Sequence, residues 1–455
     1  MSAVVVGGGL AGAAAALALA EAGAEVVQVA AAPGATALSA GVVDVASASP
    51  GIATLPWRDA LRGSPLLPRE RLALHRRGAP SHPYAQLFGA GDDPALPERE
   101  IETGMARLGR WLEPGGLALG GSLGANRLLA TVAGTLRVAD FAVAPAARGD
   151  LLEAQDVAVI DAPALEGWDA RALARTLAHE IDALGLAKLP VSVVHPAFPP
   201  GLFADPSPVR VAARLDASGA RAALATGVSA LGARGRVLLF PPCLGIERSA
   251  ELVYALETAS GARVAEALSF PPHAVAGFRF QRALDAAVER AGVRRVRERV
   301  RRVLAVDVDA LSLVLGDGGE RLAADAVVLA VGRFVSGGVE AGRDAVNEPL
   351  LGLPLYDADG RRIDGIPARR SARKGYGNEQ PLFSAGVRTD RRLRPLASNG
   401  RPQHARLFAA GDLLGGFDPA RERTGLGVAL VSGLRAARAA FESLRAPQAR
   451  AEGMP

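Results

Sequence analysis

Apolar runs and glycine turns alternate over the first thirty residues of the chain. Residues 4–6 are three consecutive valines, which predict a short buried strand. An alanine- and leucine-rich stretch follows a group of glycines, runs to about residue 22 and predicts a helix. After a turn at Gly23, the valines at positions 26, 27 and 29 predict a second strand, parallel to the first. The pattern therefore predicts a βαβ unit at the start of the chain.

Similar alternation returns in the last third of the chain. Four segments there predict strands, at residues 303–308, 311–315, 326–331 and 407–412. A helix is predicted to follow them at residues 428–444. The middle of the chain predicts a helix and three further strands, at residues 170–184 and at residues 156–160, 191–195 and 237–240, respectively.

The glycines between the first strand and the first helix have the spacing Gly7-x-Gly9-x-x-Gly12. One glycine permits the tight turn, one lets the backbone approach a pyrophosphate, and one lets helix and strand pack closely. The N–H groups and the positive dipole end of the following helix would then hold the phosphate. The glycine spacing alone is weak evidence for a phosphate site. The position of the motif between predicted strands, however, favours a dinucleotide or flavin phosphate site over a purely structural turn.

The acidic residue that receives the ribose hydroxyls of a dinucleotide is expected at the end of the second strand. Ala30, Ala31 and Ala32 occupy that region, and Glu25 lies at the wrong end of the strand. The ribose contact is therefore either absent or made by the backbone. This leaves FMN open in place of FAD.

Glycines also follow the predicted strands of the last third. Gly332 follows one strand, where a small residue lets the chain pass close to a flat ligand. Gly411 and Asp412 end another strand, and Gly425 and Gly427 precede the final helix. A carboxylate at the end of a strand, near a glycine-flanked helix start, suits a ribityl hydroxyl and the edge of a flavin ring. Gly411 and Asp412 could alternatively mark only the ordinary end of a strand. Considered together with the glycine motif at residues 7–12, they favour a flavin site.

These elements predict an α/β protein with a Rossmann-like FAD/NAD(P)-binding fold and an inserted second α/β domain. We expect the flavin-binding domain to comprise residues 1–50 and 271–455. The inserted domain would comprise residues 51–270, where proline and glycine interrupt the pattern.

The amino-acid composition limits the cofactors and partners that the chain can use. The single cysteine, Cys243, excludes an internal disulfide framework and a thiolate-ligated zinc or iron–sulfur site, and we expect no metal. Electrons would then reside on an organic cofactor and leave through another subunit. The net charge of +5 includes arginine-rich clusters that we interpret as solvated faces, and 4% aromatic residues with no recognised motif argue against nucleic-acid binding. Residues 3–20 are uncharged, but they lack a basic flank and carry the glycine motif, so we expect no direct membrane span.

The chain resembles the B subunits of anaerobic glycerol-3-phosphate dehydrogenase, within the fumarate-reductase-like group of flavoproteins. The similar strings extend from end to end, at residues 7–12, 39–41, 82–84, 134–137, 277–281, 336–338, 348–353, 393–395 and 413–419. The resemblance adds Ser39 and Gly41 to the expected cofactor-binding residues. The chain departs from the family at residues 424–427, where the family has a Cys-Gly-Gly-Gly-type stretch, and in the arginine-rich segment 361–374.

The resemblance implies that glycerol 3-phosphate is converted to dihydroxyacetone phosphate, with electrons passed to quinone and ultimately to fumarate or nitrate. It also implies FMN on this chain, an A-type catalytic subunit as heterodimer partner, and a membrane-anchoring iron–sulfur C subunit. The chain would be cytoplasmic and peripheral at the inner membrane through a partner. FAD is the alternative cofactor. The alternative functions are a flavin-holding scaffold or electron relay without its own substrate site, and another fumarate-reductase-like flavoprotein oxidoreductase.

Removal of hydride from a secondary alcohol requires a base near the carbinol and cations for the phosphate. His82, His195 and His273 are the candidate bases, with an ordinary buried or surface histidine as the alternative for each. Arg137 and Arg279 are the candidates for binding a phosphate bidentately. A salt bridge or a contact to the flavin phosphate is the alternative for both arginines.

Overall fold

The chain forms two compact units. The computed structural model describes residues 2–47, 67–89, 91–185, 189–232, 235–272, 274–307, 310–374 and 378–445. Unit 1 comprises Met1–Ala35, His75–Pro97 and Asp285–Pro455, and unit 2 comprises Thr36–Leu74 and Glu98–Leu284. These units differ from the predicted domains, because residues 75–97 belong to unit 1 and residues 36–47 and 274–284 to unit 2. The predicted boundary at residues 50 and 51 lies outside the described residues.

Unit 1 is built on a five-stranded parallel sheet with the order β12-β2-β1-β16-β21. The strands are β1 (Ser2–Val6), β2 (Glu25–Val29), β12 (Arg294–Val296), β16 (Ala326–Leu329) and β21 (Leu407–Ala409). Strands β1, β16 and β21 are almost wholly buried, which explains why they appear in the sequence as unbroken apolar runs. The predicted N-terminal βαβ unit and the two late buried strands are thereby confirmed.

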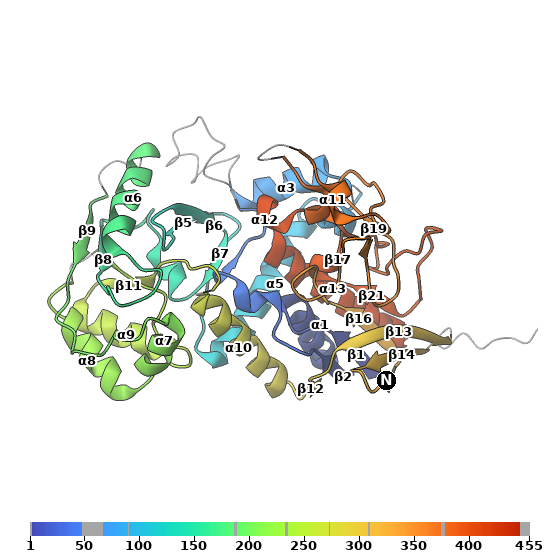
Figure 1. Ribbon diagram of the computed structural model, residues 1–455, viewed down its shortest axis with the longest axis horizontal. Helices are drawn as coiled ribbons and strands as arrows, with labels where there is room; N and C mark the ends of the chain where they lie inside the picture. The colour runs from blue at the N-terminus through green and yellow to red at the C-terminus, as the bar shows by residue number, and fades with distance from the viewer. Residues whose placement is uncertain are drawn as a thin grey trace, which may run out of the picture. The chain divides into compact units, whose positions relative to one another are not determined.

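Two helices from opposite ends of the chain pack together in unit 1 (Figure 1). They are α1 (Leu10–Glu21) and α13 (Gly425–Arg445). A Cβ on Gly433 of α13 would lie 2.5 Å from the carbonyl oxygen of Ala11, so glycine permits their close approach. Helix α13 begins three residues earlier than predicted, because glycine in a first turn does not prevent a helix that tertiary packing stabilises.

Smaller elements complete unit 1. An antiparallel sheet contains β13 (Val300–Asp307), β14 (Ala310–Leu315) and β15 (Glu320–Ala324). The remaining strands form two short pairs, β17 (Glu340–Ala341) with β18 (Val346–Asn347) and β19 (Leu355–Tyr356) with β20 (Gly386–Val387). The short helices are α4 (Pro83–Leu87), α11 (Ala368–Ser371), α12 (Pro419–Glu422), η5 (Pro381–Ser384) and η6 (Gly411–Leu413).

Unit 2 contains a second parallel sheet, with the order β11-β10-β8-β9. Its strands are β8 (Asp156–Ile160), β9 (Val191–Val194), β10 (Arg236–Phe240) and β11 (Arg263–Glu266). Its connecting helices are α6 (Ala170–Ala183), α7 (Pro208–Leu215), α8 (Ser218–Val228) and α9 (Ser249–Ser260). The three strands and the helix predicted in the middle of the chain are confirmed, whereas β11 was not predicted.

Two small antiparallel sheets accompany the parallel sheet of unit 2. They contain β3 (Val42–Val43), β4 (Leu119–Gly121) and β7 (Phe141–Val143) in one sheet, and β5 (Arg127–Ala130) and β6 (Leu136–Ala139) in the other. The chain also contains α3 (Pro68–Gly78), α5 (Leu96–Leu112), α10 (Val275–Arg290), η1 (Ala35–Leu38), η3 (Glu113–Gly115) and η4 (Ala146–Gly149). Among the helices that the structure describes, none has both the length and the apolar character that crossing a bilayer requires.

Candidate functional site

Close backbone contacts shape the glycine turn between β1 and α1. Gly7 has a φ of +125°, and a Cβ there would lie 2.1 Å from the carbonyl oxygen of Ala330. A Cβ on Gly12 would lie 2.2 Å from the carbonyl oxygen of Gly7. Gly9 is the N-cap of α1, with a φ of −78° and a ψ of −175° that any residue can adopt. The close contacts therefore require glycine at positions 7 and 12, whereas the backbone angles of Gly9 do not by themselves require it.

The N-terminus of α1 has the features of an anion site. Helix α1, which is described throughout, has neither a capping side chain at Gly9 nor an acidic residue in its first turn. Its N–H groups and its positive dipole end therefore favour a phosphate. Gln28, which no sequence pattern indicated, donates a hydrogen bond from Nε2 to the carbonyl oxygen of Gly7 at 3.0 Å. This bond ties β2 to the turn and fixes its shape.

The ends of β1, β16 and β21 meet at one edge of the sheet, because all its strands are parallel. Gly332 and Gly411 follow the last two strands and have φ values of +66° and +72°, in the left-handed region that favours glycine. A Cβ on Gly411 would lie 2.8 Å from the Cβ of Ala11, so the loop after β21 lies against α1. The structure thus brings the predicted glycines of the two ends of the chain to one edge.

A cavity of about 550 Å³ opens at the ends of β16 and β21. Its lining includes Gly332, Arg333, Phe383, Asp412 and Asp418. The volume falls within the range of small-molecule and cofactor pockets. Burial raises the pKa of the Asp412 carboxyl, and the Arg333 guanidinium partly opposes this rise. The cavity is therefore large enough for a heterocyclic ring system, and its wall includes charged side chains.

Arg333 is a site residue that the sequence patterns did not indicate. Its guanidinium is buried and donates to backbone carbonyl oxygens, from Nε to Asp412 at 3.1 Å, from Nη2 to Leu414 at 3.1 Å, and from Nη1 to Phe383. Burial lowers the pKa of Arg333, while nearby carboxylates act to raise it. The residue therefore anchors the loop after β21 and places a cation beside the cavity. Its position directly after Gly332 is the one signal that could have identified it.

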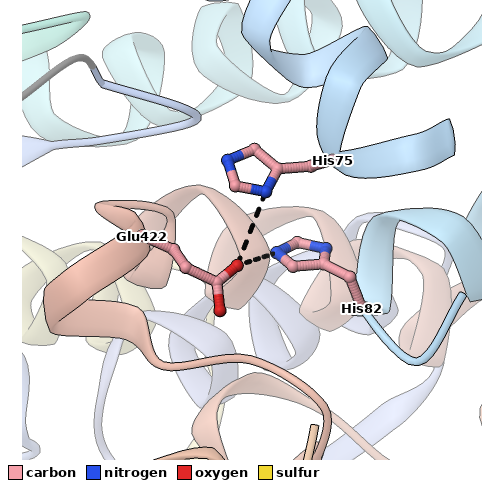
Figure 2. A group of neighbouring side chains, drawn as sticks. All are labelled: His75, His82 and Glu422. Atoms are coloured by element: carbon pink, nitrogen blue, oxygen red, sulfur yellow. Dashed lines mark ion pairs between the residues drawn. The ribbon is translucent and has the colours of Figure 1, made fainter. Parts of the chain in front are cut away.

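His82 lies in a cluster with His75 and Glu422 in unit 1 (Figure 2). His82 Nε2 and His75 Nδ1 lie 3.3 Å and 3.5 Å from the same oxygen, Oε2 of Glu422. The other carboxylate oxygen accepts the backbone N–H of Asp418 at 2.7 Å, while the Asp418 side chain caps α12. This reciprocal pattern resembles a capping box, with the glutamate one position later in the helix. Burial acts to raise the pKa of Glu422, but the hydrogen bond and charge of His82 lower it on balance.

The backbone around His82 determines which ring nitrogen carries the proton. His82 Nδ1 accepts the N–H of Tyr84 at 3.0 Å, so a neutral His82 carries its proton on Nε2, which lies 3.3 Å from Glu422 Oε2. A histidine that binds a metal usually donates from its other nitrogen, and here that nitrogen accepts. The arrangement therefore favours a histidine–carboxylate ion pair over a metal site. It also leaves the neutral ring without a nitrogen that could accept a substrate proton, so the base role of His82 stays a prediction that this geometry does not favour.

Replacement of Glu422 tests this interpretation. We expect Glu422→Ala to lower the free energy of unfolding by about 2–4 kcal/mol, because it removes a cap and the carboxylate that pairs with the buried His82. Glu422→Gln keeps an acceptor oxygen and should lose less than half of that amount. Urea denaturation of both variants measures the difference. If a chelator destabilised the unmodified protein as much as Glu422→Ala does, the cluster would be a metal site instead.

Two predicted cofactor-binding residues, Ser39 and Gly41, belong to unit 2. Gly41 has a φ of +75°, and a Cβ there would lie 2.7 Å from Cγ2 of Val143. Packing within unit 2 therefore explains this glycine. In unit 1, a Cβ on Gly425 would lie 2.9 Å from the Cβ of Pro419, and Gly427 is buried in the first turn of α13. Cofactor binding by these four residues stays a prediction.

The two arginines predicted to bind phosphate both contact carboxylates of unit 2. Arg137 pairs with Asp44, which lies near Asp140, a buried carboxyl whose pKa is raised by burial and by the charge of Asp44 to about 7. Arg279 pairs with Glu266 at 3.1 Å, and both side chains are buried. Arg279 also donates to the carbonyl oxygen of Gly245 at 2.6 and 3.0 Å. These contacts favour the salt-bridge alternative for both arginines.

His195, the second candidate base, contacts a carboxylate of the neighbouring strand. His195 is exposed at the end of β9, and its Nδ1 lies 2.8 Å from Asp161 Oδ2 at the end of β8. The pair belongs to unit 2. His273 lies outside the described residues.

Comparison with known proteins identifies related chains. A family described as an FAD binding domain matches residues 2–428. A Halobacterium salinarum protein, named as a probable B subunit of anaerobic glycerol-3-phosphate dehydrogenase, is 31% identical over 97% of this chain and 98% of its own length. A Yersinia pseudotuberculosis protein, named as the B subunit of the same enzyme, is also 31% identical, over 94% of this chain and 95% of its own length. Among solved structures, 3-ketosteroid delta1-dehydrogenase from Sterolibacterium denitrificans is 12% identical with a TM-score of 0.40, over 97% of this chain and 99% of its own length, a likeness too low to indicate a shared function.

The family match also bears on the cofactor. It names FAD, so it supports a flavin and does not support the expected preference for FMN. The preference for FMN rested partly on the alanines at positions 30–32, and these residues remove only one side-chain contact to a ribose. The glycine turn, the uncapped N-terminus of α1 and the adjoining cavity fit a flavin nucleotide without that contact.

Proposed function

Because the chain belongs to the family of anaerobic glycerol-3-phosphate dehydrogenase B subunits and to the FAD binding domain family, we propose that it is the FAD-holding subunit of such a dehydrogenase. The family makes it a flavoprotein oxidoreductase and one subunit of a larger enzyme. We propose that the enzyme converts glycerol 3-phosphate to dihydroxyacetone phosphate and passes the electrons to quinone, and ultimately to fumarate or nitrate.

The observation that carries this proposal is the meeting of both ends of the chain at one edge of the unit 1 sheet. Gly7, Gly9 and Gly12 would hold the cofactor phosphate at the N-terminus of α1. Gly332 and Asp412 would lie beside its ring system, at the cavity. Backbone groups in place of an acidic side chain would meet the adenosine ribose of FAD.

The protein groups at this edge would orient the cofactor and set its electrostatic surroundings. A bound flavin supplies the two-electron acceptor for hydride removed from a carbinol carbon. Arg333 holds the loop that carries Asp412 and places a buried cation beside the cavity. The positive charge of Arg333 would stabilise negative charge that develops in the pocket. Its hydrogen bonds to backbone carbonyl oxygens would keep the loop rigid.

A second candidate function, a flavin-holding electron relay without its own substrate site, is favoured by a specific observation. Four of the five candidate residues that the sequence indicated are engaged with a carboxylate of their own unit, namely His82, His195, Arg137 and Arg279, and the fifth, His273, lies outside the described residues. Substrate oxidation would then take place in the A-type subunit. This chain would receive electrons and pass them to an iron–sulfur C subunit that anchors the complex at the inner membrane.

Reconstitution with an A-type subunit tests the proposal. We expect the purified chain alone to be yellow, to release FAD on denaturation, and to reduce a dye with glycerol 3-phosphate at less than about a tenth of the rate of the reconstituted pair. The measurement is a steady-state assay at matched flavin content, with mass analysis of the released chromophore. Equal rates for the chain and the pair would contradict the relay. Absence of activity in both would contradict the substrate, and release of FMN would contradict the proposed cofactor.

A further inference from the structure

Two carboxyl groups stand opposite each other in the interior of unit 2. Asp44 directly follows β3, and Asp140 directly precedes β7. The two strands are antiparallel and Val43 pairs with Phe141, so the next residues, Asp44 and Asp140, are neighbours across the sheet. Asp44 exposes 5% of its surface and Asp140 exposes 0%. The register of this small sheet therefore places two acids side by side in the core of the unit.

The two acids hold the segment that follows β3. Asp140 Oδ2 accepts the backbone N–H groups of Val45 and Ala46, both at 2.8 Å. The hydroxyl of Ser47 donates to Asp44 Oδ1 at 2.5 Å. Asp140 thus ties β7 to a segment nearly a hundred positions earlier in the chain. We call Asp140 and residues 44–47 the carboxyl latch.

The cations near the carboxyl latch do not pair with both acids. Arg137 on β6 pairs with Asp44. Among the residues that the structure describes, no ion pair joins Asp140 to a cation, and its Oδ1 makes no hydrogen bond. Arg71 faces the latch from α3, but its Nε donates to the carbonyl oxygen of Ala46 at 3.0 Å. Burial lowers the pKa of Arg71, and the charge of Asp140 acts to raise it. One acid therefore has an ion pair and the other has none.

This arrangement favours a proton on Asp140. A buried carboxylate without a cation is costly, and such a group usually takes up a proton instead. Two adjacent carboxylates also repel each other, so one of them becomes harder to ionise. Burial and then the charge of Asp44 raise the pKa of Asp140 from the usual 3.8 to about 7, although the N–H groups of Ala46 and Val45 act to lower it. Asp44 has the arginine, so the proton belongs on Asp140.

We propose that Asp44 and Asp140 bind one proton between them in weakly acidic solution, and that residues 44–47 open more readily as the pH rises. In the opened segment, water surrounds the carboxyl of Asp140 and its pKa returns to the usual 3.8. The closed latch therefore binds the proton more tightly than the opened one. The stability that the proton gives is complete below about pH 4 and is lost as the pH rises to about 7. The proposal does not depend on the cofactor or the substrate.

Hydrogen–deuterium exchange of the complete chain tests the proposal, with the peptide that contains residues 44–47 as the readout. Asp140→Asn is uncharged at every pH and keeps an oxygen that can accept both N–H groups. The exchange rate of this peptide in the unmodified protein is divided by the rate in Asp140→Asn at the same pH, so that the chemical effect of pH cancels. We expect this ratio to rise at least about tenfold between about pH 5 and pH 7, because opening releases one proton. Above about pH 8 the ratio should be constant.

Asp44→Asn gives a second comparison that does not require Asp140→Asn to fold. It removes the neighbouring negative charge, so the rise should move to lower pH, and the unmodified protein should open increasingly more than this variant towards about pH 7. Asp169→Asn is the matched control, because Asp169 is an exposed acid of unit 2 that caps α6. Its ratio to the unmodified protein should not change with pH. A ratio independent of pH for either latch variant would overturn the proposal.

Discussion

Replacing Gly9 with valine should reduce the flavin content of the purified protein at least tenfold while the fold is retained. Gly9 has backbone angles that valine can adopt, so the substitution does not strain φ and ψ at this position. Its side chain would instead fill the space at the N-terminus of α1 that the phosphate requires. Absorbance of the bound flavin relative to protein measures the loss, and circular dichroism reports on the fold.

A second glycine provides the control for this experiment. Gly78, also in unit 1, has open space where a Cβ would be added. Gly78→Val should therefore keep the flavin. Full flavin occupancy in Gly9→Val would show that the phosphate does not bind at this turn. Parallel loss of flavin and of helical signal would show that the substitution acts on the fold.

Replacing Arg279 with methionine should lower the free energy of unfolding by about 3–5 kcal/mol, because Glu266 would be left as a buried charge without a cation. Both partners are almost completely buried, and Arg279 also binds the carbonyl oxygen of Gly245. The double variant Glu266→Gln, Arg279→Met should recover part of the loss. Urea denaturation of the single and double variants measures the coupling between the two side chains.

The control for Arg279 lies on the same helix, α10. Arg282 is half exposed and pairs with an exposed carboxylate, Glu247. Arg282→Met should change the free energy of unfolding by less than about 1 kcal/mol. If Arg279→Met left stability unchanged and instead weakened the use of glycerol 3-phosphate, Arg279 would be a substrate ligand and the ion pair would be secondary.

The sequence was sufficient for the features of the fold that depend on local pattern. Three valines and the spacing of Gly7, Gly9 and Gly12 predict β1, the turn and α1, because strand, turn and helix are contiguous in the chain. The sequence also placed Gly411 and Asp412 at the end of a buried strand. It assigned these segments to one flavin site, but it did not give the order of strands that brings them to one edge of the sheet.

The residues that were missed or misjudged depend on contacts between distant segments. His82 and Glu422 are 340 positions apart, so no local spacing indicates that the two side chains form an ion pair. Arg279 stands in a string that resembles the family, and the string carries no sign of its pairing with Glu266. Arg333 follows a predicted glycine directly, but its carbonyl partners belong to the loop after β21.

The order in which the chain is synthesised sets when each unit can be completed. The parallel sheet of unit 2 uses strands between residues 156 and 266, so all its strands are available before the last third of the chain is made. Unit 1 begins with β1 and α1 but requires β16, β21 and α13, which end at residue 445. During translation, the glycine turn is therefore made well before β16 and α13, which pack beside it in the folded unit. A flavin that binds at this edge would therefore be captured only after the residues of α13 have left the ribosome.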